Sequence, residues 1–115
     1  ENNLQYTADS IAQICNYAAL AANLNEPEKA ITALKKCTEY TEENSGIYAE
    51  LLWNTGIIYL QINDKENAVP NLKKALNIYA EIYEDEPELM QRKISELQDA
   101  VSAYGINAQN LISEN

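Results

Sequence analysis

The sequence contains two copies of one pattern, 38 residues apart. Small and apolar residues recur at helical spacing in both copies: Ile14, Ala18, Ala21, Ala30, Leu34 and Cys37 in the first, and Leu52, Gly56, Tyr59, Ala68, Leu72 and Ala75 in the second. The polar stretch between them also returns, since NEPEKAI at 25–31 corresponds to NDKENAV at 63–69. Self-similarity at a fixed period of this size is typical of a stacked repeat architecture.

Helices are the expected building blocks of these repeats. Three Gly and three Pro in 115 residues leave little room for turns. Apolar residues recurring with a period of 3.6 predict five helices, over residues 4–24, 27–41, 47–62, 64–84 and 87–104. Pro27 fits the first turn of its helix, Asp64 fits an N-terminal cap and Gly105 a C-terminal one. Pro70 falls inside the fourth helix, where we expect a slight kink.

Composition excludes several classes of function. The net charge of −10 argues against nucleic acid and against an anionic membrane surface as partners. The chain has no His, the commonest metal ligand and general base, so we expect no metal and no cofactor. No apolar run approaches the roughly 20 residues of a membrane span. Catalysis by paired carboxylates needs a pocket, whereas the acids here lie mainly at helix ends and on outward faces, so the sequence predicts no enzyme.

The two cysteines, Cys15 and Cys37, are 22 residues apart and form no CxxC motif. Such cysteines most often behave as small apolar residues in a reducing compartment, which favours a cytoplasmic location. A disulfide between them is the alternative if the first two helices are antiparallel. The chain begins at Glu1 without an initiator Met, which predicts a fragment of a longer protein or a processed form.

These residues resemble the signature of the tetratricopeptide repeat, W-x2-L-G-x2-Y…A-x3-F…P. The second copy matches it with Leu52, Thr55, Gly56, Tyr59, Ala68 and Leu72, and the first with Tyr17, Ala18, Ala21, Ala30 and Leu34. Gly56 must be small because Ala68 of the next helix is expected to pack against it. The resemblance covers residues 11–104. It departs from the family in its period of 38 instead of about 34, and the closing Pro is absent.

The resemblance implies an all-α fold, a right-handed α-solenoid of antiparallel helix pairs with about five helices and a short tail. Its expected units are a first repeat over about 11–46, a second over about 47–85, a capping helix over about 86–104 and a tail over 105–115. The capping helix corresponds to the first helix of a third repeat whose partner helix is missing. Two repeats and a cap are fewer than the roughly three repeats that a stable solenoid needs, so continuation or self-association is also open.

In this family the first helix of each repeat lines a concave groove that binds peptides. Carried over residue by residue, the predicted groove consists of Cys15, Asn16, Ala19, Asn23, Glu50, Trp53, Asn54, Ile57, Gln61, Gln91, Ser95 and Gln98. Branches of the family that clamp a terminal carboxylate use Lys and Arg on these helices, but here no Lys faces in and Arg92 stands at the edge. The groove is instead apolar and rich in amides, which suits an extended peptide or an amphipathic helix.

Trp53 has two possible roles, as an exposed anchor in the groove or as a core residue packed on the neighbouring repeat. The densest run of acids, at residues 81–88, is either a solvated turn or a contact for a basic partner. We therefore predict a non-enzymatic protein- or peptide-binding scaffold. Two alternatives stay open: a peptide-sensing regulatory domain of a bacterial regulator, and an oligomerisation scaffold without a separate ligand.

Overall fold

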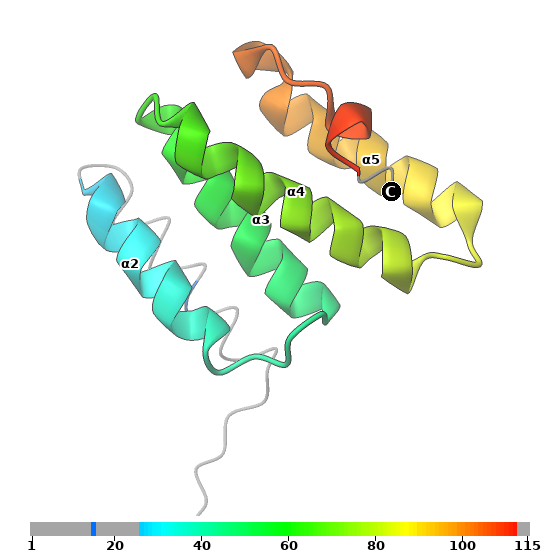
Figure 1. Ribbon diagram of the computed structural model, residues 1–115, viewed down its shortest axis with the longest axis horizontal. Helices are drawn as coiled ribbons and strands as arrows, with labels where there is room; N and C mark the ends of the chain where they lie inside the picture. The colour runs from blue at the N-terminus through cyan, green and yellow to red at the C-terminus, as the bar shows by residue number, and fades with distance from the viewer. Residues whose placement is uncertain (1–14, 16–25, 113–115) are drawn as a thin grey trace, which may run out of the picture.

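The computed structural model describes Cys15 and residues 26–112. Its elements are α2 (Pro27–Thr38), α3 (Gly46–Gln61), α4 (Lys65–Ile82), α5 (Pro87–Val101) and two 3₁₀ turns, η1 (Ser102–Tyr104) and η2 (Ala108–Leu111). Within these residues every regular element is helical, which confirms the all-α prediction (Figure 1). The helix predicted over 4–24 lies outside the described residues except for Cys15, which is helical.

α3 and α4 begin within one residue of their predicted starts, because capping residues stand there. The Ser45 hydroxyl accepts a hydrogen bond from the Tyr48 backbone N–H at 3.1 Å and caps α3. The Asp64 carboxylate accepts one from the Asn67 N–H at 3.2 Å and caps α4. Such side-chain acceptors satisfy N–H groups that have no partner in the first helical turn. Pro27 stands in the first turn of α2, as predicted.

The end of α5 also follows the prediction, with a different last turn. The α-helix stops at Val101, and residues 102–104 continue as a 3₁₀ turn. Gly105 then adopts φ 74°, and the Ile106 N–H donates to the Val101 carbonyl at 3.4 Å. A residue with positive φ followed by a bond of this kind is a common helix terminator. The chain thereby turns back, and residues 106–112 return across the molecule.

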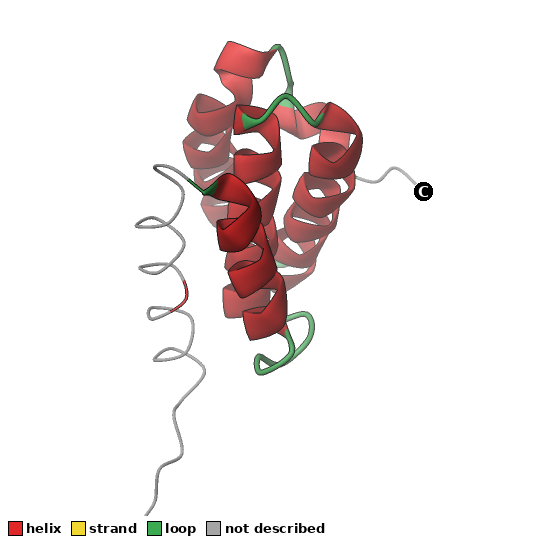
Figure 2. Ribbon diagram, turned by 90° about the vertical axis from the view of Figure 1, so that its left-hand side faces the viewer, coloured by secondary structure: helices red, strands yellow, loops and turns green. Residues whose placement is uncertain are grey.

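The helices pack as neighbours along the chain (Figures 1 and 2). α3 and α4 form the most extensive pair and run antiparallel, while α2 packs on the other side of α3. The larger core cluster gathers side chains from α3, α4, α5 and η2, with Leu72 and Leu76 fully buried at its centre. A second cluster joins Cys15 to Leu34 of α2 and Leu51 of α3. The core is therefore divided between two successive helix interfaces.

α4 lies close against Gly56 of α3. A Cβ placed on Gly56 would lie 2.5 Å from Cδ2 and 2.7 Å from Cγ of Leu72, and 3.2 Å from the Ala68 carbonyl oxygen. The prediction that this position must be small is supported, but the Leu72 side chain limits the space more than Ala68 does. Pro70, the residue that contradicted the helical pattern, stands inside α4, which continues from Lys65 to Ile82.

At the two cysteines the structure differs from the sequence prediction. Cys15 and Cys37 form a disulfide, with their Cα atoms 6.4 Å apart. The prediction of two separate thiols is therefore wrong, and the alternative of a disulfide holds. The physical reason is the packing of Cys15 against α2, which brings the two Cα atoms within the range that a disulfide spans. The preference for a reducing compartment, which depended on free thiols, loses its support.

Candidate functional site

Four of the predicted groove residues form one stripe along α3. Glu50 and Gln61 are exposed, and Asn54 and Ile57 between them are half-buried. Their spacing of four, three and four residues places them on one side of the helix. The other faces of α3 are largely buried, because the helix is covered by α2 on one side and by α4 on another. We call these four residues the α3 stripe.

On α5, Gln91 and Ser95 are exposed, one helical turn apart. Gln98 does not share their exposure, because its side chain bonds to the chain's own backbone. Its Nε2 donates to the Ile106 carbonyl at 2.9 Å, and its Oε1 accepts from the Ala108 N–H at 2.7 Å. Sequence reasoning missed this role, since nothing in the α5 pattern indicates where residues 106–112 lie.

The structure decides between the two roles of Trp53. Its side chain is only 5% exposed and belongs to the larger core cluster with Ala49 and Tyr79. Trp53 is therefore a core residue, the second of its two predicted roles, and its place in the predicted groove is corrected. The reason is that α3 is covered on more than one side, so that a residue one position away from the exposed stripe turns into the core.

The predicted contribution of the first helix to the groove rests on residues that the structure mostly does not describe. Asn16, Ala19 and Asn23 lie outside the described residues. Cys15 is described, but it is buried and bound to Cys37 in the disulfide. The accessible part of the predicted groove thus consists of the α3 stripe, Gln91 and Ser95.

Tyr79 of α4 has the most perturbed ionisation described in the molecule. Burial raises the pKa of Tyr79 from 10.0 to about 12, with further contributions from the negative charge of Glu50, from Tyr83 and from Glu96. Tyr79 belongs to the same core cluster as Trp53 of α3 and Ile94 of α5. The Lys93 ammonium lies 4.9 Å from the centre of the Tyr79 ring.

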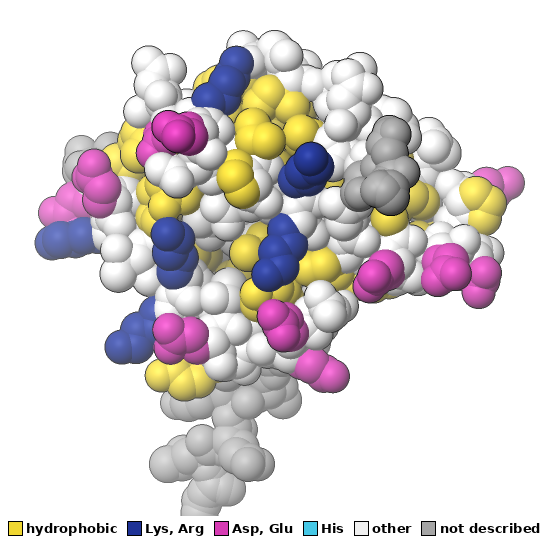
Figure 3. Space-filling view, in the orientation of Figure 1, with side chains coloured by type: hydrophobic (Ala, Val, Ile, Leu, Met, Phe, Trp, Pro, Cys, Tyr) yellow, Lys and Arg dark blue, Asp and Glu magenta, His cyan; other side chains and the backbone are white. Residues whose placement is uncertain are grey.

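Two other lysines lie over tyrosine rings of neighbouring helices. Lys35 of α2 lies 5.5 Å from the centre of the Tyr59 ring, and Lys74 of α4 lies 5.5 Å from that of Tyr48, both on α3. Figure 3 shows Lys and Arg side chains among apolar ones on the face where α2 and α4 lie. The acids of the 81–88 run, in contrast, are all exposed, as a solvated turn requires.

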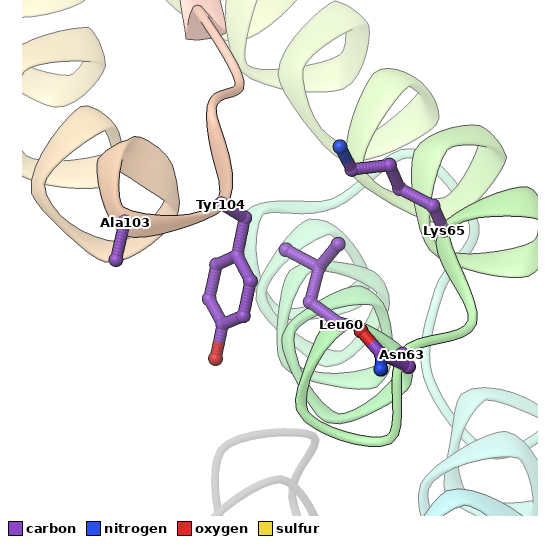
Figure 4. A pocket seen from close by; sticks show the side chains of 5 residues that line it. All are labelled: Leu60, Asn63, Lys65, Ala103 and Tyr104. Carbon is purple, nitrogen blue, oxygen red and sulfur yellow. The ribbon is translucent and has the colours of Figure 1, made fainter.

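A hollow of about 390 Å³ lies beside the turn between α3 and α4. Leu60, Asn63, Lys65, Ala103 and Tyr104 line it. Figure 4 shows the Tyr104 hydroxyl and the Lys65 ammonium pointing away from each other. Because its polar groups do not converge on one point, the hollow lacks the arrangement that orients a small polar ligand.

The described residues contain no cluster of His, Cys, Asp and Glu that could hold a metal ion. Among the helices that the structure describes, none is long and apolar enough to cross a membrane. On α3 and α5, the accessible residues of the predicted groove are amides, a carboxylate, a hydroxyl and an apolar side chain.

Comparison with known proteins identifies the class. The family model described as tetratricopeptide repeat matches residues 14–44 and 49–82, together more than half of the chain. The chain therefore belongs to the tetratricopeptide repeat family, whose repeats generally serve as protein-interaction modules. Neither the curated proteins nor the solved structures gave a match.

Proposed function

We propose that this chain binds a segment of a partner protein on the surface formed by the α3 stripe with Gln91 and Ser95 of α5. The observation that carries the proposal is the accessible, amide-rich stripe on α3 within a chain of the tetratricopeptide repeat family. Amide side chains can pair with the backbone of an extended peptide, while Ile57 supplies apolar contact. The net charge of −10 favours a basic segment as the ligand.

The proposal includes the predicted arrangement of repeats. We infer a right-handed solenoid with a 38-residue period, in which α5 is the first helix of an incomplete third repeat. Its support is the equivalence of α2 and α4: they begin at Pro27 and Lys65, and Leu34 and Leu72 are both fully buried. The repeats would then extend over about 11–46 and 47–85, the capping helix over 86–104 and the tail over 105–115.

A peptide array tests the function. The parent chain and two variants are applied to the same immobilised library of extended basic peptides. Asn54→Arg places a bulky cation on the α3 stripe, whereas Lys73→Ala changes an exposed position of α4 that is not part of the stripe. We expect the immobilised peptides that bind the parent chain to bind the Lys73→Ala variant as well. The same peptides should no longer bind the Asn54→Arg variant.

If every peptide that binds the parent chain also binds the Asn54→Arg variant equally well, the proposal is contradicted. Circular dichroism of each variant checks that the helices are intact. Sedimentation of the parent without peptide separates binding from self-assembly, because a scaffold without a ligand would form oligomers on its own.

A further inference from the structure

The return of the chain after Gly105 fills an apolar groove between α4 and α5. η2 contacts both helices, and Figure 1 shows it lying over α5 and beside α4. Ala108 is fully buried in the larger core cluster, and the side chains of Ile106, Leu111 and Ile112 pack against that cluster. Residues 106–112 thus lie in this α4–α5 groove as a short, mostly non-helical segment.

Gln98 holds this segment through its backbone. The side-chain amide makes two hydrogen bonds, one with the Ile106 carbonyl at 2.9 Å and one with the Ala108 N–H at 2.7 Å. Both distances lie in the normal range for such bonds. Because the amide pairs with main-chain groups on both sides of Asn107, it binds a backbone shape, which the Asn107 side chain supports by accepting a hydrogen bond from the Gln109 N–H at 2.9 Å.

The side chains of residues 106–112 divide into those that face the groove and those that face solvent. Position 108 accepts only a small residue, since Ala108 has no exposed surface. Positions 106, 111 and 112 carry branched apolar side chains against the core, while Asn107, Gln109 and Asn110 are exposed. No residue from 104 to 112 is charged. The groove therefore takes an uncharged segment in which a small residue stands between branched apolar ones.

The connection to α5 allows residues 106–112 to leave the groove while the chain stays covalently intact. Gly105 connects it to α5 with φ 74°, and glycine can adopt many other backbone conformations. Within the segment, Asn110 and Ile112 donate hydrogen bonds to Asn107 and Gln109. These local bonds can form in any chain that adopts the same turn, so they do not require covalent connection to α5.

We propose that the α4–α5 groove is a second peptide-binding site, separate from the α3 stripe. Residues 106–112 occupy it as an intramolecular ligand, and an uncharged segment of a partner protein with the same pattern takes their place. The attached segment competes at an effective concentration of order millimolar, as short linkers give. The apparent affinity for an external peptide is lowered by the fraction of molecules in which the groove is open.

The test uses the full 115-residue chain and a fluorescent synthetic peptide with the sequence of residues 104–112. Ala108→Asp introduces a carboxylate at a fully buried position and expels the attached segment from the groove. In an anisotropy titration this variant should bind the peptide at least about tenfold more tightly than the parent does, because the competitor is removed. The matched control is Asn110→Asp, which adds the same charge at an exposed position and should behave like the parent.

Two further measurements define the site. Adding Gln98→Leu to Ala108→Asp should weaken peptide binding at least about tenfold, since both backbone hydrogen bonds are lost. A peptide with Asp in place of its Ala should not bind to any variant. Equal affinity of the parent and Ala108→Asp, or binding that does not depend on Gln98, would overturn the proposal.

Hydrogen exchange on the parent chain keeps the proposal testable if Ala108→Asp does not fold. The Ala108 amide should exchange at least roughly 100-fold faster than the Leu76 amide in α4, because the segment opens without unfolding of the core. Equal rates would mean that the segment leaves only on global unfolding and would refute the proposal. Sedimentation as a dimer that exchanges residues 106–112 between two copies would refute it as well, since the groove would then serve self-association.

Discussion

At the scale of single residues, Gly56 is a position where the packed neighbour leaves no room for a larger side chain. Gly56→Ala should destabilise the fold by about 1–3 kcal/mol, because the added methyl group would overlap the buried Leu72 side chain. Gly46→Ala is the matched control, since its new Cβ would meet only Ile82 Cδ1, at 3.8 Å. Urea unfolding measures both changes, and equal stability of the two variants would contradict the close contact at Gly56.

Trp53 should behave as a core residue in solution. Its emission should already lie towards the blue in the free protein, since the side chain is 5% exposed. Trp53→Ala should lower the free energy of unfolding by about 3–5 kcal/mol through the cavity that it leaves. Tyr40→Ala, at a side chain that is 61% exposed, provides the comparison and should cost little. Red-shifted emission with unchanged urea stability would show that the indole is not buried.

Because the pKa of Tyr79 is raised, we expect the fold to lose stability at alkaline pH. Its pKa is raised to about 12 in the folded protein, above the 10.0 of an unperturbed tyrosine. The folded state therefore holds the phenol proton more tightly, and its contribution to stability is complete below pH 10 and is lost as the pH rises through about 12. Urea titrations in this interval should show a smaller pH-dependent loss for Tyr79→Phe than for the parent. An identical slope in both proteins would exclude Tyr79 as the source.

At the scale of elements, the disulfide fixes Cys15 to α2. Reduction should lower the free energy of unfolding by about 3 kcal/mol, the value typical of a closed loop of this length, 22 residues. The measurement is urea unfolding with and without a reductant. The double variant Cys15→Ala and Cys37→Ala should not respond to reductant. A parent that also fails to respond would show that the bond contributes nothing to stability.

The sequence predicts those features that are determined by residues close together in the chain. Asp64 caps the start of α4 through a hydrogen bond, and Gly105 ends the last turn through its backbone conformation. Both act within a few residues of themselves, so their roles can be read from the chain. The burial of Trp53 and the contact of Gln98 with Ile106 depend instead on which distant segment covers each side chain. The pairing of Cys15 with Cys37 is of the same kind, because it depends on how two elements pack.

At the scale of the whole molecule, the larger core cluster depends on the last quarter of the chain. α5 and η2 contribute Ile94, Val101 and Ala108 to it. A chain that ends before Pro87 should therefore expose buried apolar surface around Trp53 and Tyr79, and we expect aggregation or loss of cooperative unfolding. Sedimentation and thermal melting test this. A monomeric truncated chain with an unchanged melting temperature would show that α5 is dispensable.

The contacts between helices also have a consequence for how fast the fold forms. α2 packs on α3, α3 on α4, and α4 with α5 and η2, so most of the contacts described join segments that are next to each other, or nearly so, in the chain. Bringing such segments together closes only short loops, and proteins rich in local contacts fold within microseconds to milliseconds. Each helix of this chain can therefore find its neighbour soon after both have left the ribosome, before the rest of the sequence has been synthesised.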